Sequence, residues 1–264
     1  MTGFSTPEVL IGNRTTSSLE IWATNEDGEL RQIDSISLDY HVHDVKAADF
    51  DHDNDLDLVV GLRAYGLYYI ENTGGPGVVG NWDIRNIDDS YSWQVLVDDF
   101  DRDGHLDVFN CADQMRIHAF YGDGASHFTQ GADVPDSDTL LPVPIGFNVF
   151  DKNGDNRPDL IGMDGAYMRV FLNPGNRTAP WNAYQKVQLG DYPSLRPREA
   201  AAKVSPSAAD LDGNNLIDQV AFVGTPDEPN STDLVIIKQG PGGGGINGIG
   251  APAATVPAWL RNGA

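Results

Sequence analysis

The sequence predicts an all-β protein built from repeated antiparallel sheets of four strands each. Three observations predict this class. An aspartate-rich segment recurs four times, each copy is followed at once by a strand-like apolar run, and hardly any segment has helical periodicity, apart from a turn near residues 196–202. The copies begin at residues 49, 99, 151 and 210. Such regular spacing indicates similar units that bury their faces against one another.

Length and charge narrow the classes of function. The chain has 264 residues and a formal net charge of −22. No run of about 18 apolar residues occurs, so we expect no membrane insertion, and the opening residues lack the features of a signal peptide. Phosphate groups would be repelled over the whole surface, so nucleic acid is not an expected partner. Cations are the expected partners.

The acidic residues are mostly aspartate, with only seven Glu among the 39 acidic residues. A tight loop that brings several carboxylates to one point favours the shorter side chain. The single cysteine, Cys111, lies in a strand-like run, which excludes a disulfide framework and a thiolate metal cluster. The composition therefore favours oxygen ligands for a metal.

The repeated segment has one pattern of oxygen-bearing side chains. Its copies are DFDHDNDLD (loop 1, 49–57), DFDRDGHLD (loop 2, 99–107), DKNGDNRPD (loop 3, 151–159) and DLDGNNLID (loop 4, 210–218). Each has Asp or Asn at positions 1, 3 and 5 and Asp at position 9. Position 6 is Asn54, Gly104, Asn156 or Asn215, residue types that enter the left-handed backbone region easily. We expect a sharp turn there.

This spacing suits a hard divalent cation bound by oxygen alone, with alternate side chains and a position-7 backbone carbonyl as ligands. Calcium fits best, because magnesium needs stricter octahedral geometry and zinc prefers His or Cys. We expect about four calcium ions. The predicted metal residues are Asp49, Asp51, Asp53, Asp55, Asp57, Asp99, Asp101, Asp103, His105, Asp107, Asp151, Asn153, Asp155, Arg157, Asp159, Asp210, Asp212, Asn214, Leu216 and Asp218.

Two alternatives for these loops are an EF-hand and an Asp-rich turn without metal. An EF-hand needs a bidentate Glu at position 12 and flanking helices, but position 12 is Val60, Asn110, Gly162 or Ala221, which excludes it. A solvated Asp-rich turn without metal is the remaining alternative.

Strand-like segments complete each unit. One precedes each loop (HDVKAADF, WQVLVDDF, IGFNVFD, VSPSAADL), one follows it (LVVG, VFNC, LIGM, QVAFVG), and further strands follow in GLYYIEN, MRIHAFYG, MRVFLNPG and DLVIIKQG and then in WDIRNID and YQKVQLG. Before the first loop, LEIWAT and RQIDSISL fit the same pattern. Units of this kind predict the blades of a β-propeller, of which about five are visible.

These segments resemble the FG-GAP and VCBS repeats of integrin α-chains and of many secreted proteins. The resemblance rests on VKAADFDHDNDLDLVVG, VLVDDFDRDGHLDVF, FNVFDKNGDNRPDLIG and AADLDGNNLIDQVAFVG, and covers roughly residues 8–240. It implies a propeller with calcium between the first and second strands of a blade. It also implies adhesion, lectin-like or accessory roles outside the cell or on its surface.

Both ends depart from the repeat. Aligning PEVLIG with LDLVVG gives a first blade without its innermost strand and calcium loop. We assign residues 1–240 to the propeller and 241–264 to a Gly/Pro/Ala-rich tail, which is either a closing strand, for example TVPAWL, or a linker. A longer or assembled propeller is the alternative to closure within one chain.

In an up-and-down meander, the loops after the first and third strands emerge on one face and the other loops on the opposite face. The face opposite the calcium loops is therefore predicted to carry Tyr40, His43, Arg63, Tyr65, Tyr91, Trp93, Tyr192 and Arg198. Aromatic rings there suit a sugar face or a protein loop. Packing between adjacent blades is the other interpretation of these aromatics.

The sequence thus predicts a calcium-stabilised, non-catalytic module that binds a glycan or a protein. Neither a nucleophile elbow nor a P-loop, HExxH or dinucleotide motif occurs, so we do not expect an enzyme. Two alternatives stay open: the propeller of a secreted polysaccharide-degrading enzyme, and a scaffold subunit of an oligomer or larger assembly.

Overall fold

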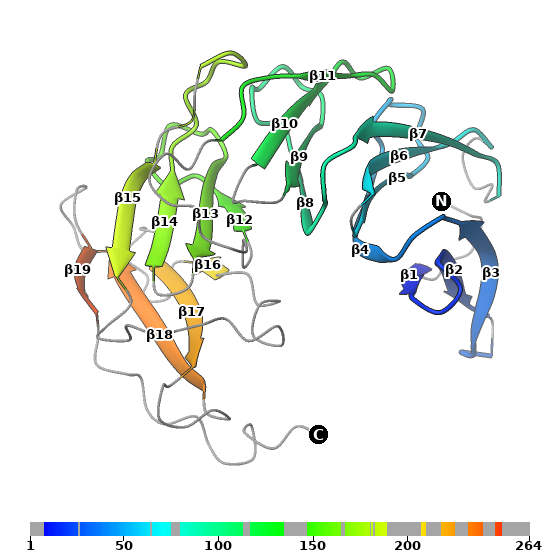
Figure 1. The fold of residues 1–264 in the computed structure, drawn as a ribbon, viewed down its shortest axis with the longest axis horizontal. Coiled ribbons are helices and arrows are strands. Elements are labelled where there is room, and N and C mark those ends of the chain that lie inside the picture. Colours follow the sequence, from blue (N-terminus) through cyan, green and yellow to red (C-terminus); the bar gives the residue numbers. More distant parts are fainter. Residues whose placement is uncertain are drawn as a thin grey trace. The chain divides into compact units, whose positions relative to one another are not determined.

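The structure is a computed structural model that contains nineteen strands among its described residues (Figure 1). It describes residues 8–25, 27–63, 65–74, 80–112, 117–134, 147–164, 167–179, 181, 183–188, 207–209, 218–224, 232–239 and 246–249. The chain divides into two compact units, Met1–Pro135 with Asn176–Pro180 and Asp136–Gly175 with Trp181–Ala264. None of the described elements is a helix long and apolar enough to cross a bilayer.

The first unit contains three antiparallel sheets, and the strands in each follow the order of the chain. The first sheet is β1 (Glu8–Asn13), β2 (Ser18–Thr24) and β3 (Leu30–Ser37). The second is β4 (Val42–Ala48), β5 (Asp57–Leu62), β6 (Gly66–Asn72) and β7 (Trp82–Asp88). The third is β8 (Gln94–Asp98), β9 (Asp107–Cys111), β10 (Ile117–Gly122) and β11 (Phe128–Gln130).

The second unit contains two more antiparallel sheets of the same order. One is β12 (Phe147–Phe150), β13 (Asp159–Asp164), β14 (Tyr167–Phe171) and β15 (Ala183–Gln188). The other is β16 (Ser207–Ala209), β17 (Asp218–Gly224), β18 (Thr232–Gln239) and β19 (Ile246–Ile249).

The predicted all-β class and the repeated meander are confirmed, and the first sheet has three strands, as the alignment of PEVLIG predicted. Two short strands were missed. β11 has only three residues, and β19 lies in the Gly-rich segment 241–264, where its pairing with β18 supplies the fourth strand. The turn near 196–202 and TVPAWL lie outside the described residues. Arrangement of the sheets around one axis stays a prediction.

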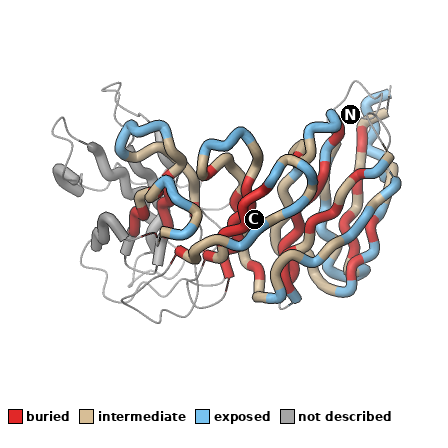
Figure 2. The backbone as a smooth tube through the Cα atoms, turned by 90° about the horizontal axis from the view of Figure 1, so that it is seen from above, coloured by how far each residue is buried: buried red, intermediate tan, exposed pale blue. Residues whose placement is uncertain are grey.

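The core of the first unit lies between consecutive sheets (Figure 2). β5 is buried along its whole length, because successive side chains point to opposite faces and both faces are covered. Leu58, Val60 and Leu62 pack towards the first sheet, whereas Val59 packs towards the third sheet beside Val95. The first strands also meet, since β4 contacts both β1 and β8. These contacts hold the two aspartate loops of this unit in place.

Strand pairing separates two ends of the first unit. In the second sheet, Ala48 pairs with Asp57 at the end that carries loop 1, while Val42 pairs with Leu62 at the other end. In the third sheet, Asp98 pairs with Asp107 beside loop 2. Loops 1 and 2 lie side by side, since His52 Nε2 is 3.1 Å from His105 Nδ1. The turn between β5 and β6 emerges at the opposite end.

Candidate metal sites and ligand surface

The three described loops share one backbone hydrogen-bond pattern. The carboxylate at position 1 accepts a hydrogen bond from the position-6 amide, and position 5 accepts one from position 7. The position-1 bonds are Asp49 to Asn54 (3.2 Å), Asp99 to Gly104 (3.0 Å) and Asp151 to Asn156 (2.7 Å), and the position-5 bonds are Asp53 to Asp55 (3.0 Å), Asp103 to His105 (2.9 Å) and Asp155 to Arg157 (2.9 Å). The three loops therefore adopt the same conformation although their sequences differ.

Two positions in each loop have a positive φ. Position 6 does so at Asn54 (71°), Gly104 (92°) and Asn156 (65°), as the sequence predicted. Position 4 does so as well, at His52 (65°), Arg102 (64°) and Gly154 (75°). Sequence reasoning missed position 4, because its residue type differs among these three loops and Arg seldom adopts this conformation.

The aspartate at position 9 is fully buried and fixes the loop to the hairpin that follows. Its carboxylate accepts the position-2 amide and a second amide beyond the next strand. The pairs of donors are Phe50 and Asn72 for Asp57 (3.3 and 2.9 Å), Phe100 and Gly122 for Asp107 (2.8 and 2.9 Å), and Lys152 and Asn173 for Asp159 (2.8 and 2.7 Å). Burial raises the pKa of Asp107 to about 7, against the opposing effect of these donors. The sequence did not signal this role.

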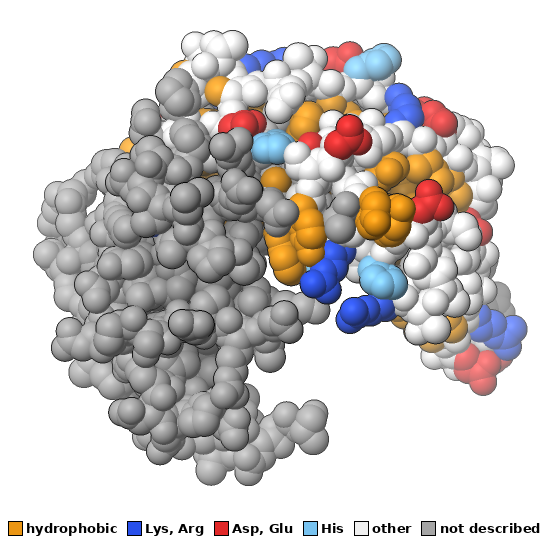
Figure 3. All heavy atoms as spheres, viewed as in Figure 1, with side chains coloured by type: hydrophobic (Ala, Val, Ile, Leu, Met, Phe, Trp, Pro, Cys, Tyr) orange, Lys and Arg blue, Asp and Glu red, His pale blue; other side chains and the backbone are white. Residues whose placement is uncertain are grey.

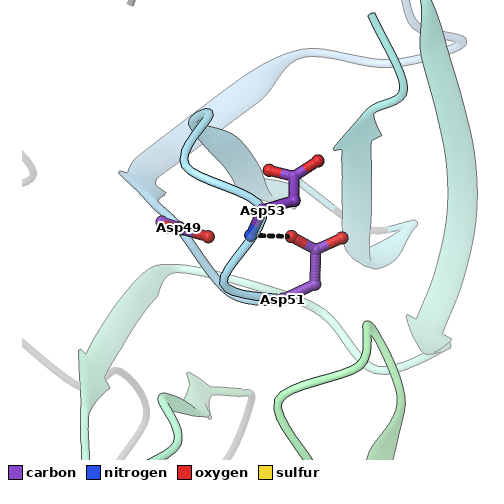
Figure 4. Close-up of side chains that lie close together, drawn as sticks. All are labelled: Asp49, Asp51 and Asp53. Atoms are coloured by element: carbon purple, nitrogen blue, oxygen red, sulfur yellow. Dashed lines mark hydrogen bonds between the residues drawn. The ribbon is translucent and has the colours of Figure 1, made fainter. Parts of the chain in front are cut away.

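Loop 1 brings three carboxylates close to one another (Figure 4). Asp49, Asp51 and Asp53 each place one carboxylate oxygen within 4.8 Å of the others. Oδ1 of Asp49 and both carboxylate oxygens of Asp55 are buried without a hydrogen-bond partner. Burial, together with Asp53 and Asp57, raises the pKa of Asp55 to about 6. A cation bound at Asp49, Asp51 and Asp53 would satisfy the Asp49 oxygen, so these residues fit calcium.

Loop 2 has a similar cluster but a different neighbour. Asp99, Asp101 and Asp107 each offer an oxygen within 4.8 Å of the others. The Arg177 guanidinium makes ion pairs with Asp101 and Asp103, and the bond to Asp101 raises the pKa of Arg177. The carboxylate geometry fits calcium here too, with a protein cation on two of the ligands.

Loop 3 is the least acidic of the described loops. Asn153 replaces one carboxylate, and Arg157 Nη2 lies 3.8 Å from Asp155 Oδ2. Among the described residues, Asp151, Asp155 and Asp159 do not form a three-carboxylate group like those of loops 1 and 2. In loop 4, Asp210, Asp212, Asn214 and Leu216 lie outside the described residues, and only the backbone of Asp218 is described.

Six of the eight predicted ligand-binding residues come together at the end opposite loops 1 and 2. We call these residues the aromatic cluster: Tyr40, His43, Arg63, Tyr65, Tyr91 and Trp93. The Tyr40 and Tyr65 rings stack face to face. Trp93 lies 5.0 Å from Tyr91 and 5.0 Å from His43 between ring centroids. Tyr192 and Arg198 lie outside the described residues.

Arg63 joins the aromatic cluster to the turn between β5 and β6. Its Nε donates a 2.7 Å hydrogen bond to the Tyr91 hydroxyl, and its guanidinium carbon is 5.8 Å from the Trp93 ring centre. Tyr65 is 46% exposed, whereas Tyr40 packs partly against the core of the first two sheets. Part of the aromatic cluster therefore packs against the core, and part of it is exposed to solvent. Figure 3 shows hydrophobic side chains beside basic and histidine side chains on one face of the described part of the chain.

A polar cluster around Asp88, which sequence reasoning missed, links the second and third sheets. We call it the Asp88 cluster. Asp88 Oδ2 accepts hydrogen bonds from Asn110 Nδ2 (2.7 Å) and His118 Nδ1 (2.9 Å), and Oδ1 accepts one from the Ser90 amide (2.9 Å). Burial alone would raise the pKa of Asp88, but these bonds lower it to about 2. His118 Nε2 lies 4.0 Å from Asp133. No sequence motif joins these residues, because three strands from two sheets supply them.

The buried Cys111 lies in β9, where burial raises the pKa of its thiol. That environment disfavours a reactive thiolate and is consistent with packing.

Comparison with known proteins identifies an FG-GAP-like repeat at residues 99–162. A search of curated protein sequences finds no match. The solved structures that are similar to the chain include two binding or matrix proteins. One is an Agrocybe aegerita lectin that recognises non-reducing terminal N-acetylglucosamine, with 18% identity, a TM-score of 0.49 and coverage of 86% of this chain and 65% of the lectin. The other is the V. cholerae biofilm matrix protein Bap1, with 15% identity, a TM-score of 0.49 and coverage of 88% and 34%. This chain spans less than two thirds of either protein.

Proposed function

We propose that this chain, which carries an FG-GAP-like repeat, is a calcium-stabilised binding module without catalytic activity. It recognises a glycan or a protein through the aromatic cluster. The observation that carries the proposal is the separation of two kinds of chemistry in the first unit. Clustered carboxylates gather at one end, and partly exposed rings with an arginine gather at the other.

In this proposal, calcium has a structural role. In loop 1, Oδ1 of Asp49 is buried without a partner beside the carboxylates of Asp51 and Asp53, and an unsatisfied buried charge is costly. A divalent ion held by these three carboxylates would satisfy that oxygen and fix the loop between β4 and β5. Loops of this type fill at the millimolar calcium concentrations found outside cells, so we propose an extracellular or cell-surface location.

The aromatic cluster supplies the binding surface. Trp93 and Tyr91 present adjacent rings, which stack on sugar faces or receive a protein loop. Arg63 uses its Nε for the Tyr91 hydroxyl, and its terminal amino groups are the proposed donors to a ligand. The Tyr40 and Tyr65 stack extends the surface along the same end.

The experiment is a glycan array and a pull-down from extracellular material with the full chain and with Trp93→Ala. The variant should lose at least about tenfold in affinity for the wild-type ligand, because interface Trp residues often contribute more than 1 kcal/mol. Its melting temperature in calcium should change less than its affinity, since Trp93 is only half-buried. Equal binding by both proteins would exclude this surface.

A turnover assay on acidic polysaccharides separates the proposal from the enzyme alternative. Hydrolysis that is lost in His118→Asn would favour an enzyme, because the Asp88–His118 pair is the described arrangement most like an oriented acid–base group. An obligate complex on size-exclusion chromatography would favour a scaffold subunit.

A further inference from the structure

Arg177 reaches from the connection between β14 and β15 onto two carboxylates of loop 2. We propose that Arg177 acts as a built-in competitor for calcium at loop 2, so that loop 1 binds calcium more tightly than loop 2. This inference rests on the proposed function, since it requires that both loops bind calcium.

The equivalent position next to loop 1 carries a neutral residue. The Gly122 and Asn173 amides occupy matching places, because each bonds the position-9 aspartate of its own sheet. Four residues after them stand Ser126 and Arg177. Each reaches the aspartate loop of the preceding sheet.

The two residues contact corresponding ligands. Ser126 Oγ donates a 3.1 Å hydrogen bond to Asp51 Oδ2, at position 3 of loop 1. Arg177 Nε donates to Asp101 Oδ2, at position 3 of loop 2, and its Nη2 donates to Asp103. One structural position thus delivers a hydroxyl to loop 1 and a full positive charge to loop 2.

The two loops also differ at position 1. Oδ1 of Asp49 in loop 1 is buried without a hydrogen-bond partner, whereas no buried carboxylate oxygen of loop 2 lacks a partner in the described structure. Calcium bound at Asp49, Asp51 and Asp53 therefore gains an unsatisfied ligand and displaces no protein cation. Calcium at loop 2 must first displace a guanidinium, which stays charged at any physiological pH.

Arg177 stays near loop 2 after such a displacement. Its carbonyl oxygen accepts a 2.7 Å hydrogen bond from the Ala132 amide, which fixes the backbone. Its guanidinium carbon lies 5.2 Å from the Tyr121 ring centre, and the side chain is 39% exposed. The side chain has room to move towards solvent while the aromatic face still attracts it.

The test is a calcium titration of the ¹⁵N-labelled full chain, followed by NMR at two amides. The Asn54 amide reports loop 1 and the Gly104 amide reports loop 2, because each bonds the position-1 carboxylate of its loop. In the wild type, the Asn54 signal should reach its midpoint at lower calcium. Arg177→Ser should lower the Gly104 midpoint roughly tenfold, and Ser126→Arg should raise the Asn54 midpoint by a similar factor.

Arg31→Ser is the matched control, because it removes the same charge from an exposed pair with Glu29 away from the loops. It should move neither midpoint by more than about twofold, a change within the weak range of surface charge effects. Melting adds a second readout. Arg177→Ser should melt below the wild type in chelator, where two carboxylates lose their cation, and this deficit should vanish in calcium.

The outcomes separate the two levels of the proposal. If calcium moves neither amide signal in the wild type, the calcium sites and this inference both fail. If calcium moves both signals but Arg177→Ser leaves the Gly104 midpoint unchanged, only the competition is refuted. Should Ser126→Arg not fold, the Gly104 midpoint in Arg177→Ser still decides.

Discussion

Tyr69→Phe tests the link between the core and loop 1. Tyr69 is fully buried, and its hydroxyl donates a 2.7 Å hydrogen bond to Asp57 Oδ2 and lies 3.0 Å from Ser126 Oγ. Its ring packs edge-on against Phe50 and Phe128. The substitution removes one oxygen atom and leaves this ring packing in place. The change therefore isolates the hydroxyl.

The expected cost follows from the carboxylate that loses its donor. A buried hydrogen bond to a charged group contributes about 1.5 to 3 kcal/mol to the free energy of unfolding. Asp57 keeps two backbone donors, so we expect about 2 kcal/mol. For a chain of this size, that corresponds to a fall of about 4 to 8 °C in the melting temperature.

The assay is thermal unfolding by circular dichroism in calcium, with Tyr68→Phe as the control. Tyr68 is the preceding residue of β6, and its side chain packs against the other core cluster, between the first and second sheets. The Tyr68→Phe variant should melt within about 2 °C of the wild type, as expected for a minor change at a half-buried position. Equal melting of Tyr69→Phe and the wild type would refute the role assigned to this hydroxyl.

Three further predictions concern stability. In chelator, the free energy of unfolding should fall as pH rises from about 4 to about 7. The raised pKa values of Asp107 (about 7) and Asp55 (about 6) mean that the folded state keeps protons that the unfolded state releases. Denaturant titrations at several pH values measure this fall, and calcium should make it smaller. Asp88→Asn should cost about 1 to 3 kcal/mol at pH 7, and the wild-type advantage should disappear as pH falls from about 4 through about 2, which acid titration measures. Gly66→Ala should cost more than about 1 kcal/mol by denaturant unfolding, because Gly66 has φ of +106° and a Cβ there would lie 2.3 Å from Asp88 O.

The sequence predicted the sheets because the repeat marks its own boundaries. Each loop begins after one strand and ends at the first residue of the next, as Asp57 and Asp107 do in β5 and β9. The left-handed turn at position 6 was predictable because Asn and Gly favour it. The gathering of Tyr91, Trp93 and Arg63 was predictable from strand direction alone.

Other features depend on contacts that no local pattern encodes. The position-9 aspartates look like metal ligands in the sequence, but their carboxylates also accept amides that lie 14 or 15 residues further along. Arg177 contacts Asp101 across 76 residues, so its role depends on how neighbouring elements pack. The Asp88 cluster likewise exists only because β7 meets the third sheet.

The most direct test of the central claim is calorimetric melting of the metal-stripped chain in chelator and in millimolar calcium. If calcium neutralises the aspartate loops, each loop filled at 100 times its dissociation constant adds about 2.7 kcal/mol, and the melting temperature rises by several degrees. Superimposable melts in the two buffers would contradict the claim.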